Sequence, residues 1–206
     1  IKVDAYKCGQ KVASMYRDIQ AVLKDCDTNF INNNPPIVTA PVGTQTWTII
    51  PNGAILPSYE TTVNSGDLIT FDIVGTDSDI YPSGVPQDLF MEISGGQMAA
   101  DYVTNFLCEN PPCATFTDLA GNLPPIISPA IAEGVFEWQT SCDHVSSNSV
   151  CVSSQNLYQF SIKVFDDFCP APAIRTSTLL IYVEGLCVDT IGCTDSLAGN
   201  YNPLAT

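Results

Sequence analysis

The sequence predicts an all-β fold, a two-sheet β-sandwich with long loops, for most of its 206 residues. Three observations lead to this expectation. Apolar and polar residues alternate with a period of two between Tyr158 and Val164, whereas the helical period of 3.6 is almost absent. The chain contains 15 Pro and 13 Gly, which divide it into short segments. Two stretches of the chain also repeat one another, as the modules of an array do.

The expected strands are short and are separated by turn signals. The clearest covers residues 68–74 and follows the turn sequence Asn64-Ser-Gly-Asp. The segment 158–165 alternates as a half-buried strand does. The remaining expected strands are Thr46–Ile50, Tyr59–Val63, Leu89–Ile93, Val135–Thr140 and Thr178–Val183. About seven such strands are typical of an Ig-like or cadherin-like sandwich, and we interpret residues 94–132 as a long loop insertion.

Residues 1–26 and 162–187 match at a constant offset of 161 residues. Both open with Ile-Lys-Val, and both place one Cys seven residues after that Ile and another eighteen residues later. We therefore expect residues 1–26 to be the C-terminal hairpin of a preceding Ig-like module and residues 27–187 to be a complete module. Residues 188–206 would begin a following Cys/Asp/Asn-rich segment. Because the chain starts at Ile1 without a Met or a signal-like apolar run, we interpret it as part of a longer protein.

The charge of the chain is strongly negative and unevenly distributed. The formal net charge is −15, and five of the seven basic residues lie in the first 24 positions. From Asp25 to Ile162 there is no Lys or Arg, against fifteen Asp and Glu. A nucleic-acid partner is therefore not expected, because phosphate binding needs clustered basic residues. No apolar stretch approaches the ~18 residues of a membrane-spanning helix. The acidic surface either serves solubility alone or supplies carboxylates that bind metal ions.

Nine cysteines indicate an oxidising, extracellular compartment. No Cys-x-x-Cys pair occurs, and the cluster of Cys142, His144 and Cys151 lacks the spacing of zinc ligands. Cys8 lies at the tip of the expected first hairpin and Cys26 at the far end of its second strand. At about 3.3 Å per residue they are too far apart for a disulfide, which needs Cα atoms within about 7 Å.

We predict a disulfide between Cys26 and Cys169 as a staple between consecutive modules, since both are expected at the same end of the sandwich. Two local disulfides are predicted in loops. These pairs are Cys108–Cys113 and Cys142–Cys151. A rival pairing joins Cys142 to Cys169, and Cys187 has the alternatives of Cys193 or a cysteine further along the chain.

The sequence does not predict an enzyme. A Ser-His-Asp triad would have to use His144, the only histidine, which lies in a Ser-rich loop without a nucleophile-elbow sequence. Gly95-Gly96 fits a turn better than a phosphate-binding loop. Phe136 and Trp138 lie on an alternating strand, so we expect them in the core rather than on a sugar-stacking surface.

Three segments that are far apart in the sequence are expected to meet at one end of the sandwich. One follows an early strand and contains Asp77 and Asp79, and another precedes the last strand and contains Asp166 and Asp167. The third is the segment that leads into the module, with Asp27, Asn29 and Asn32. Calcium prefers six to eight oxygen ligands of this kind, so the sequence predicts a calcium site there. The alternative is that Asp and Asn occupy these turns for local hydrogen bonding alone.

The incoming segment 27–36 and the sequence Ile73-Val-Gly-Thr-Asp-Ser-Asp resemble the cadherin arrangement, in which Asp and Asn residues share calcium between domains. More broadly, the chain resembles Ig-like or cadherin-like repeats of large type 9-secreted surface proteins of Bacteroidetes, which act in gliding and adhesion. The resemblance rests on Asn64-Ser-Gly-Asp-Leu-Ile-Thr-Phe, Val135-Phe-Glu-Trp-Gln-Thr-Ser-Cys, Asp166-Asp-Phe-Cys-Pro and the tail that begins at Gly192.

This resemblance implies a non-enzymatic, structural or adhesive repeat at the cell surface. The implied partners are neighbouring modules of the same chain and surface glycans or other surface proteins. The alternative function is a carbohydrate-binding accessory module of a secreted polysaccharide-active enzyme.

Overall fold

The computed structural model describes residues 2–7, 10–16, 33–50, 58–145, 155–168 and 171–185, and for residues 2–16 it describes the backbone alone. Within these ranges the chain is almost entirely β-structure, which confirms the expected all-β class. The strands are β1 (Lys2–Lys7), β2 (Gln10–Tyr16), β3 (Ile37–Val38), β4 (Val42–Gly43), β5 (Thr48–Ile50), β6 (Ser58–Asn64), β7 (Leu68–Thr76), β8 (Asp88–Ser94), β9 (Thr115–Thr117), β10 (Ile126–Pro129), β11 (Ile131–Gln139), β12 (Gln155–Asp166) and β13 (Ile174–Glu184). The one helical element in these ranges is the 3-10 turn η1 (Cys142–His144). A membrane-crossing helix is thus absent from this part of the chain.

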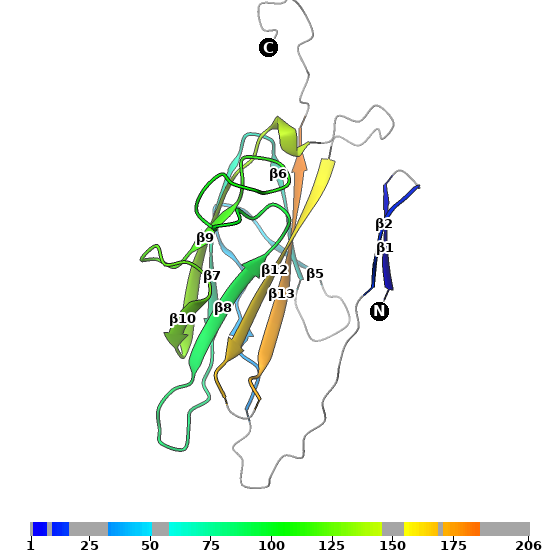
Figure 1. Cartoon of the computed structure of the whole chain (residues 1–206). Coiled ribbons are helices and arrows are strands. Elements are labelled where there is room, and N and C mark those ends of the chain that lie inside the picture. The colour runs from blue at the N-terminus through cyan, green and yellow to red at the C-terminus, as the bar shows by residue number, and fades with distance from the viewer. Residues whose placement is uncertain are drawn as a thin grey trace, which may run out of the picture.

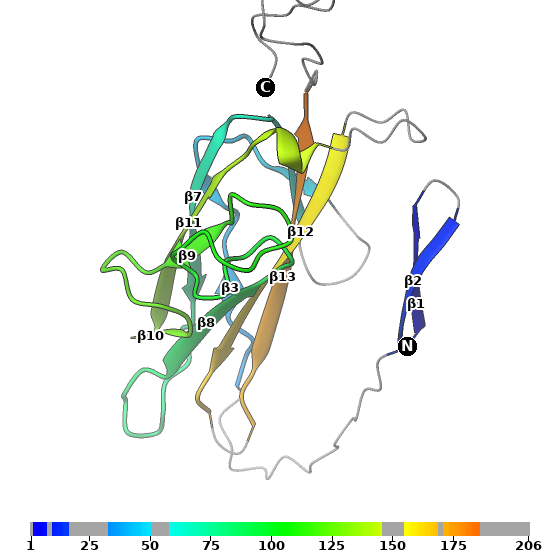
Figure 2. The ribbon, with the colours of Figure 1, turned by 45° about the horizontal axis from the view of Figure 1, so that its top comes forward.

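The strands from β3 to β13 form two sheets that face each other across a common core (Figures 1 and 2). The six-stranded sheet has the order β10-β8-β12-β13-β6-β5. The second sheet has the order β3-β7-β11-β9, and β4 also pairs with β7. β6 pairs with β13 in parallel, and the other strand pairs are antiparallel. This parallel pair places β6 beside β13, and the short strand β5 forms the edge of the sheet next to β6.

The core forms from the inward-facing positions that the sequence alternation predicts. Along β12, Tyr158, Phe160, Ile162 and Val164 are all buried. Phe136 of β11 lies 5.0 Å from Phe160 in the opposite sheet, measured between ring centroids in an edge-to-face contact. Both Phe136 and the neighbouring Trp138 are at most 1% exposed, so the expectation that they belong to the core is confirmed.

Each expected long strand is present, with boundaries that differ by a few residues. The prediction that residues 94–132 are only a loop insertion is wrong, because this segment contributes one strand to each sheet. β9 pairs with β11, and β10 pairs with β8. Strands of three or four residues are too short to show a hydrophobic period of their own, and their pairing with long neighbours stabilises them.

The hairpin of β1 and β2 and the hairpin of β12 and β13 turn at equivalent positions of the sequence repeat. Lys7 pairs with Gln10 in the first hairpin, and Phe165 pairs with Ile174 in the second. The centres of the two hairpins are therefore separated by the 161-residue offset of the sequence repeat.

Gly134 in the middle of β11 provides a test of the core packing. A Cβ atom at this position would overlap the ring of Phe116 on the neighbouring strand β9. We expect Gly134→Ala to lower the free energy of unfolding by about 1–3 kcal/mol, because overpacking forces the ring and backbone to shift. Glu137→Ala on the exposed side of the same strand is the control, with an expected change within about 0.5 kcal/mol. Equal unfolding free energies for both variants in urea would contradict this packing.

Candidate functional site

Two of the segments predicted to meet, the one after β7 and the one after β12, lie at the same end of the sandwich, at the bottom of Figure 1. Asp77 and Asp79 follow the end of β7, and Asp166 ends β12. The segment that leads into β3 joins them: Asn33 donates a hydrogen bond from Nδ2 to Asp166 Oδ2 at 3.0 Å, and Asn34 donates from Nδ2 to Asp79 Oδ1 at 3.1 Å. The other predicted ligands from this segment, Asp27, Asn29 and Asn32, lie outside the described residues.

Asp166 is a buried carboxylate with three hydrogen-bond donors around it. Its side chain is 1% exposed. Oδ1 accepts from the backbone N–H groups of Phe168 and Ala173, both at 3.0 Å, and Oδ2 accepts from Asn33. Buried polar oxygens need such donors in place of water. Asp166 therefore fixes the β12–β13 connection and holds the incoming segment against it.

Asp77 lies in a less favourable environment. Oδ1 accepts from the Asp79 backbone N–H at 2.8 Å, but Oδ2 is buried and has no hydrogen-bond partner among the described residues. Burial raises the pKa of Asp77, the Asp79 N–H counteracts this, and the charges of Asp79 and Asp166 raise the pKa further. Asn33 Oδ1 is a second buried oxygen without a partner in the described part of the chain. Both oxygens belong to residues that interact with Asp166.

Asp167 connects the same end of the sandwich to the β7–β8 loop. Its Oδ1 accepts from the backbone N–H of Asp88 at 3.0 Å, and its carbonyl oxygen accepts from the Tyr81 hydroxyl at 3.1 Å. The Tyr81 ring stacks on Phe168, with centroids 6.3 Å apart. One carboxylate oxygen and the carbonyl oxygen of Asp167 thus hold the loop.

The donor set fits a hard cation in kind. Carboxylate and amide oxygens are the ligands that calcium prefers, and two of the oxygens here are buried without a partner in the described chain. Only two basic residues, Lys163 and Arg175, occur between residues 33 and 185. Lys163 pairs with Glu92, and Arg175 donates to the carbonyl of Pro36. Within the described ranges, however, no three Asp, Glu, His or Cys side chains are arranged to hold a metal. A complete shell would need ligands from the segment before Asn33.

Of the predicted disulfides, the structure contains Cys108–Cys113, with Cα atoms 5.6 Å apart. Cys142 is also disulfide-bonded, and its partner lies outside the described residues. The remaining predicted partners, Cys26, Cys151 and Cys169, lie outside them as well, so the interdomain staple stays a prediction.

His144 is part of the core. Its side chain is fully buried against Trp138, with ring centroids 4.8 Å apart. Nδ1 accepts from the Ser141 backbone N–H at 2.8 Å, so Nε2 carries the proton and donates to the Asn110 carbonyl at 2.7 Å. Gln97, also buried, donates to the carbonyls of Asn110 and Pro112. His144 thereby joins η1 to the 94–114 segment, a role that its position in a Ser-rich loop did not indicate.

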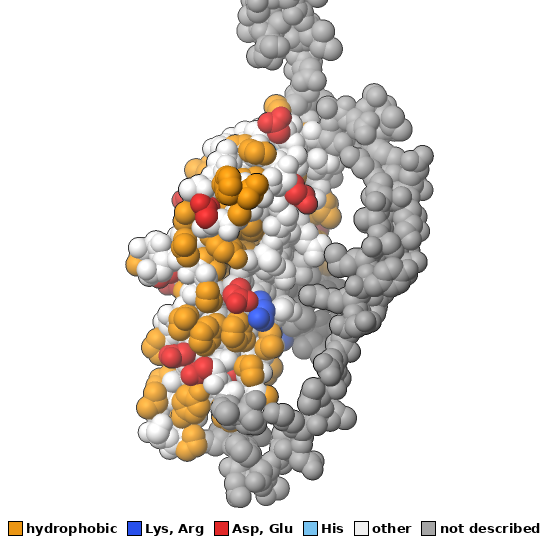
Figure 3. Space-filling model, in the orientation of Figure 1, with side chains coloured by type: hydrophobic (Ala, Val, Ile, Leu, Met, Phe, Trp, Pro, Cys, Tyr) orange, Lys and Arg blue, Asp and Glu red, His pale blue; other side chains and the backbone are white. Residues whose placement is uncertain are grey.

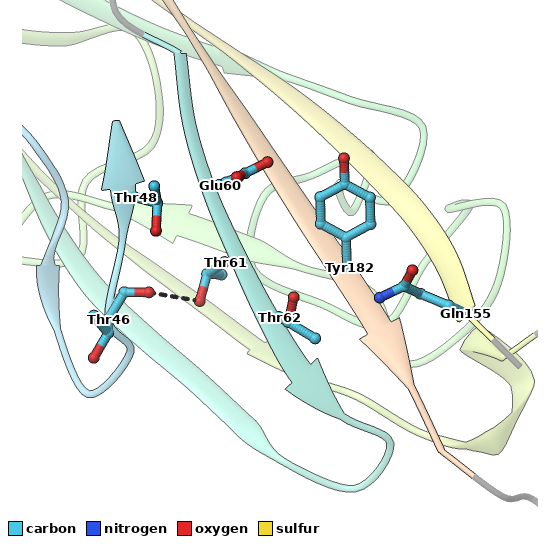
Figure 4. A pocket seen from close by; sticks show the side chains of 7 residues that line it. All are labelled: Thr46, Thr48, Glu60, Thr61, Thr62, Gln155 and Tyr182. Carbon is cyan, nitrogen blue, oxygen red and sulfur yellow. Dashed lines mark hydrogen bonds between the residues drawn. The ribbon is translucent and has the colours of Figure 1, made fainter. Parts of the chain in front are cut away.

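Two surface depressions lie on the outer face of the six-stranded sheet. The larger is a groove of about 670 Å³, with a floor formed by β8, β12 and β13 and walls that include Tyr102 and Pro124-Pro125. Tyr102 has a φ of 64°, a left-handed conformation that costs about 1–2 kcal/mol for a residue with a Cβ atom. The smaller, of about 250 Å³, is lined mainly by threonine hydroxyls, with Glu60 and Tyr182 (Figure 4).

The face drawn in Figure 3 carries apolar side chains over β8 and β10, and its acidic groups outnumber its basic ones. One apolar row crosses four strands, because Ile127 lies opposite Phe90, Phe90 opposite Phe165, and Phe165 opposite Ile174. The rings of Phe90 and Phe165 stack nearly parallel, with centroids 5.0 Å apart. They therefore face each other and do not form a coplanar platform.

No family model and no curated protein matches the chain. Among solved structures, it is similar to AggA, the major subunit of aggregative adherence fimbriae type I from Escherichia coli, at 12% identity and a TM-score of 0.34 over 75% of this chain and 99% of that one. The CooA pilin subunit from enterotoxigenic Escherichia coli has 11% identity to this chain and a TM-score of 0.32, over 61% of this chain and 90% of that one. A family 123 glycoside hydrolase from Clostridium perfringens has 15% identity to this chain and a TM-score of 0.28, over 60% of this chain and 23% of that one. Likenesses with TM-scores this low assign no function to this chain.

The buried His144 predicts a pH dependence of stability. Burial lowers the pKa of His144 below its usual 6.5, although the hydrogen bond with Asn110 and the charge of Asp143 act in the opposite direction. The unfolded chain therefore binds a proton that the folded chain does not, and stability falls as the pH decreases below about 6.5. We expect the urea midpoint to be lower at pH 5.5 than at pH 7.5. His144→Gln removes this titration and should make the two midpoints more similar, although it lowers both. An unchanged pH dependence in this variant would contradict the assignment.

Proposed function

We propose that this chain is a non-enzymatic, structural and adhesive repeat of a large secreted or cell-surface protein. Its complete module spans residues 27–187, preceded by the hairpin of another module in residues 1–26 and followed by a new segment in 188–206. The resemblance to gliding and adhesion proteins of Bacteroidetes extends the proposal to export by the type 9 system. The disulfide between Cys108 and Cys113 supports an oxidising compartment.

The observation that carries this proposal is the docking of the incoming segment onto the loops of the module. Asn33 binds Asp166, and the backbone and side chain of Asn34 both donate to Asp79. The chain therefore enters the sandwich along a defined path, held by two different loops. These contacts restrict the directions in which the chain can enter the sandwich, which supports a defined orientation between consecutive modules.

The ends of the module have the geometry of a serial array. Asn33 lies beside the end of β12, where β13 begins, because Phe165 pairs with Ile174. β13 then runs for 11 residues to Glu184, which at about 3.3 Å per residue places its end roughly 33 Å away. Asn33 and Glu184 thus lie at opposite ends of the sandwich, which supports a head-to-tail arrangement of modules.

We further propose that calcium and the Cys26–Cys169 disulfide stiffen the joint between modules. The predicted ligands are Asp27, Asn29, Asn32, Asp77, Asp79, Asp166 and Asp167. A bound cation would compensate the raised pKa of Asp77 and supply a partner to its buried Oδ2. Since each ligand segment comes from a different part of the chain, binding would restrain the incoming segment against both loops.

Calcium binding predicts a metal-dependent melting temperature. Extracellular calcium modules bind with dissociation constants of about 0.1–1 mM, so 10 mM Ca²⁺ should stabilise the fold by about 1.4–2.7 kcal/mol. For a module of this size, this corresponds to an increase of about 3–10 °C over the EDTA-treated chain, measured by differential scanning calorimetry.

Asp77→Asn separates the cation effect from the loop contacts. The substituted side chain would keep an oxygen for the Asp79 N–H but lose the charge, so the variant should melt at or above the wild-type temperature in EDTA and gain less from Ca²⁺. Asp72→Asn on the same strand β7 is the matched control and should keep the full response. The calcium proposal fails if wild type shows no response to Ca²⁺, or if Asp77→Asn responds as strongly as the control.

The disulfide staple predicts a specific set of linked peptides. Non-reducing proteolysis and mass spectrometry of the secreted 206-residue chain should recover Cys26 linked to Cys169 and Cys142 linked to Cys151. The staple would stabilise the folded state by about 2–4 kcal/mol, because it restricts the unfolded chain. Recovery of Cys142 linked to Cys169 instead would show that the proposed joint has no staple.

A further inference from the structure

We propose that the 670 Å³ groove on the outer face of the six-stranded sheet binds a short neutral oligosaccharide. Its size lies within the roughly 300–1,000 Å³ of small-molecule sites. The inference rests on the proposed adhesive role and adds to it the class of ligand and the place where the ligand binds.

The floor of the groove presents hydrogen-bonding groups in regular rows. Ser161 of β12 lies opposite Ser94 of β8, and one row further along, Lys163 lies opposite Glu92 and Thr176. The Gln159 amide continues the line along β12. Hydroxyl and amide groups spaced along a pleated sheet can donate to and accept from the hydroxyls of a sugar.

The walls of the groove present apolar surfaces. Tyr102 and the pair Pro124-Pro125 line it above the polar floor. Sugar rings carry C–H groups on their faces and hydroxyls at their edges, so they fit a site that combines apolar walls with a few placed polar groups. An apolar ligand would cover the polar groups of the floor without giving them hydrogen-bond partners.

The Tyr102 wall is held in place before any ligand binds. The N–H of Tyr102 donates to the Ala99 carbonyl at 3.0 Å, and its carbonyl accepts from Phe116 at 2.8 Å. The disulfide between Cys108 and Cys113 closes the same segment. A preformed wall lowers the entropy cost of binding, and it accounts for the left-handed backbone kept at a bulky residue.

The charges favour a neutral over an acidic sugar. Lys163 is the only cation that lines the groove; its Nζ lies 3.2 Å from Glu92 Oε2 and 4.2 Å from the centroid of the Phe165 ring. Its charge is thus already neutralised. The chain as a whole carries a net charge of −15, which repels a polyanion.

The test uses the full 206-residue chain on immobilised neutral oligosaccharides built from glucose, galactose, mannose or N-acetylglucosamine, with sialylated and sulfated glycans in parallel. We expect retention on at least one neutral class. In calorimetric titration with that oligosaccharide, Tyr102→Asn and Ser161→Trp should each lower the affinity at least about tenfold. Asn tolerates the left-handed conformation, and a Trp on the outer face of β12 fills the groove without entering the core. Tyr182→Phe in the smaller depression is the control and should bind as wild type does.

The groove proposal is overturned by absence of retention on every neutral class, by retention on acidic glycans alone, or by groove variants that bind as tightly as the control. If the first two variants do not fold, Gln159→Ala on the exposed face of β12 replaces them, with the same expected loss. Calcium-dependent melting of each protein is measured in parallel. Lost glycan binding with an intact calcium response would remove the groove and leave the structural proposal standing.

Discussion

The end of the sandwich depends on one buried carboxylate, that of Asp166. A carboxyl group with 1% exposure needs hydrogen-bond donors in place of water, and these come from the β12–β13 connection and from Asn33. One side chain therefore couples the last hairpin of the module to the segment that enters it. Loss of any of these donors would leave a buried polar oxygen with one hydrogen-bond partner fewer, so the hairpin connection and the incoming segment stabilise one another.

Because basic residues are scarce, polar side chains and backbone amides stabilise the ionised form of exposed carboxylates in this chain. Hydrogen bonds from Thr104 lower the pKa of Asp101, and hydrogen bonds from Asn122 lower the pKa of Asp118. Asp77 is the contrasting case, because burial and neighbouring carboxylates raise its pKa. A carboxyl group with a raised pKa and a buried oxygen without a partner in the described chain is suited to bind an external cation, because the cation would offset both effects. All three carboxylates accept a hydrogen bond from the backbone N–H two residues later. The difference in pKa therefore comes from their surroundings.

The sequence predicted the features that depend on long periodic segments. The alternation in β12 identified its buried face, and the positions of Asp77 and Asp166 after two strands identified which loops meet. It could not predict β9 and β10, which exist because longer strands pair with them, or the parallel pairing of β6 with β13, which is decided by sheet order. The role of His144 was also hidden, because its partner Asn110 lies 34 residues away in an irregular segment.

The groove was missed for a related reason, and its position bears on the adhesive role that we propose. Its floor belongs to regular strands, but its walls come from the segment 94–132, whose path no local pattern encodes. In a head-to-tail array both ends of each module are occupied by neighbours, so a ligand must approach from the side. The outer face of the six-stranded sheet is such a side, and Asp166 points inward at the end of that sheet while Lys163 and Ser161 point outward on the same strand. The period-two geometry of β12 thus separates the structural and the ligand-binding roles onto its two faces.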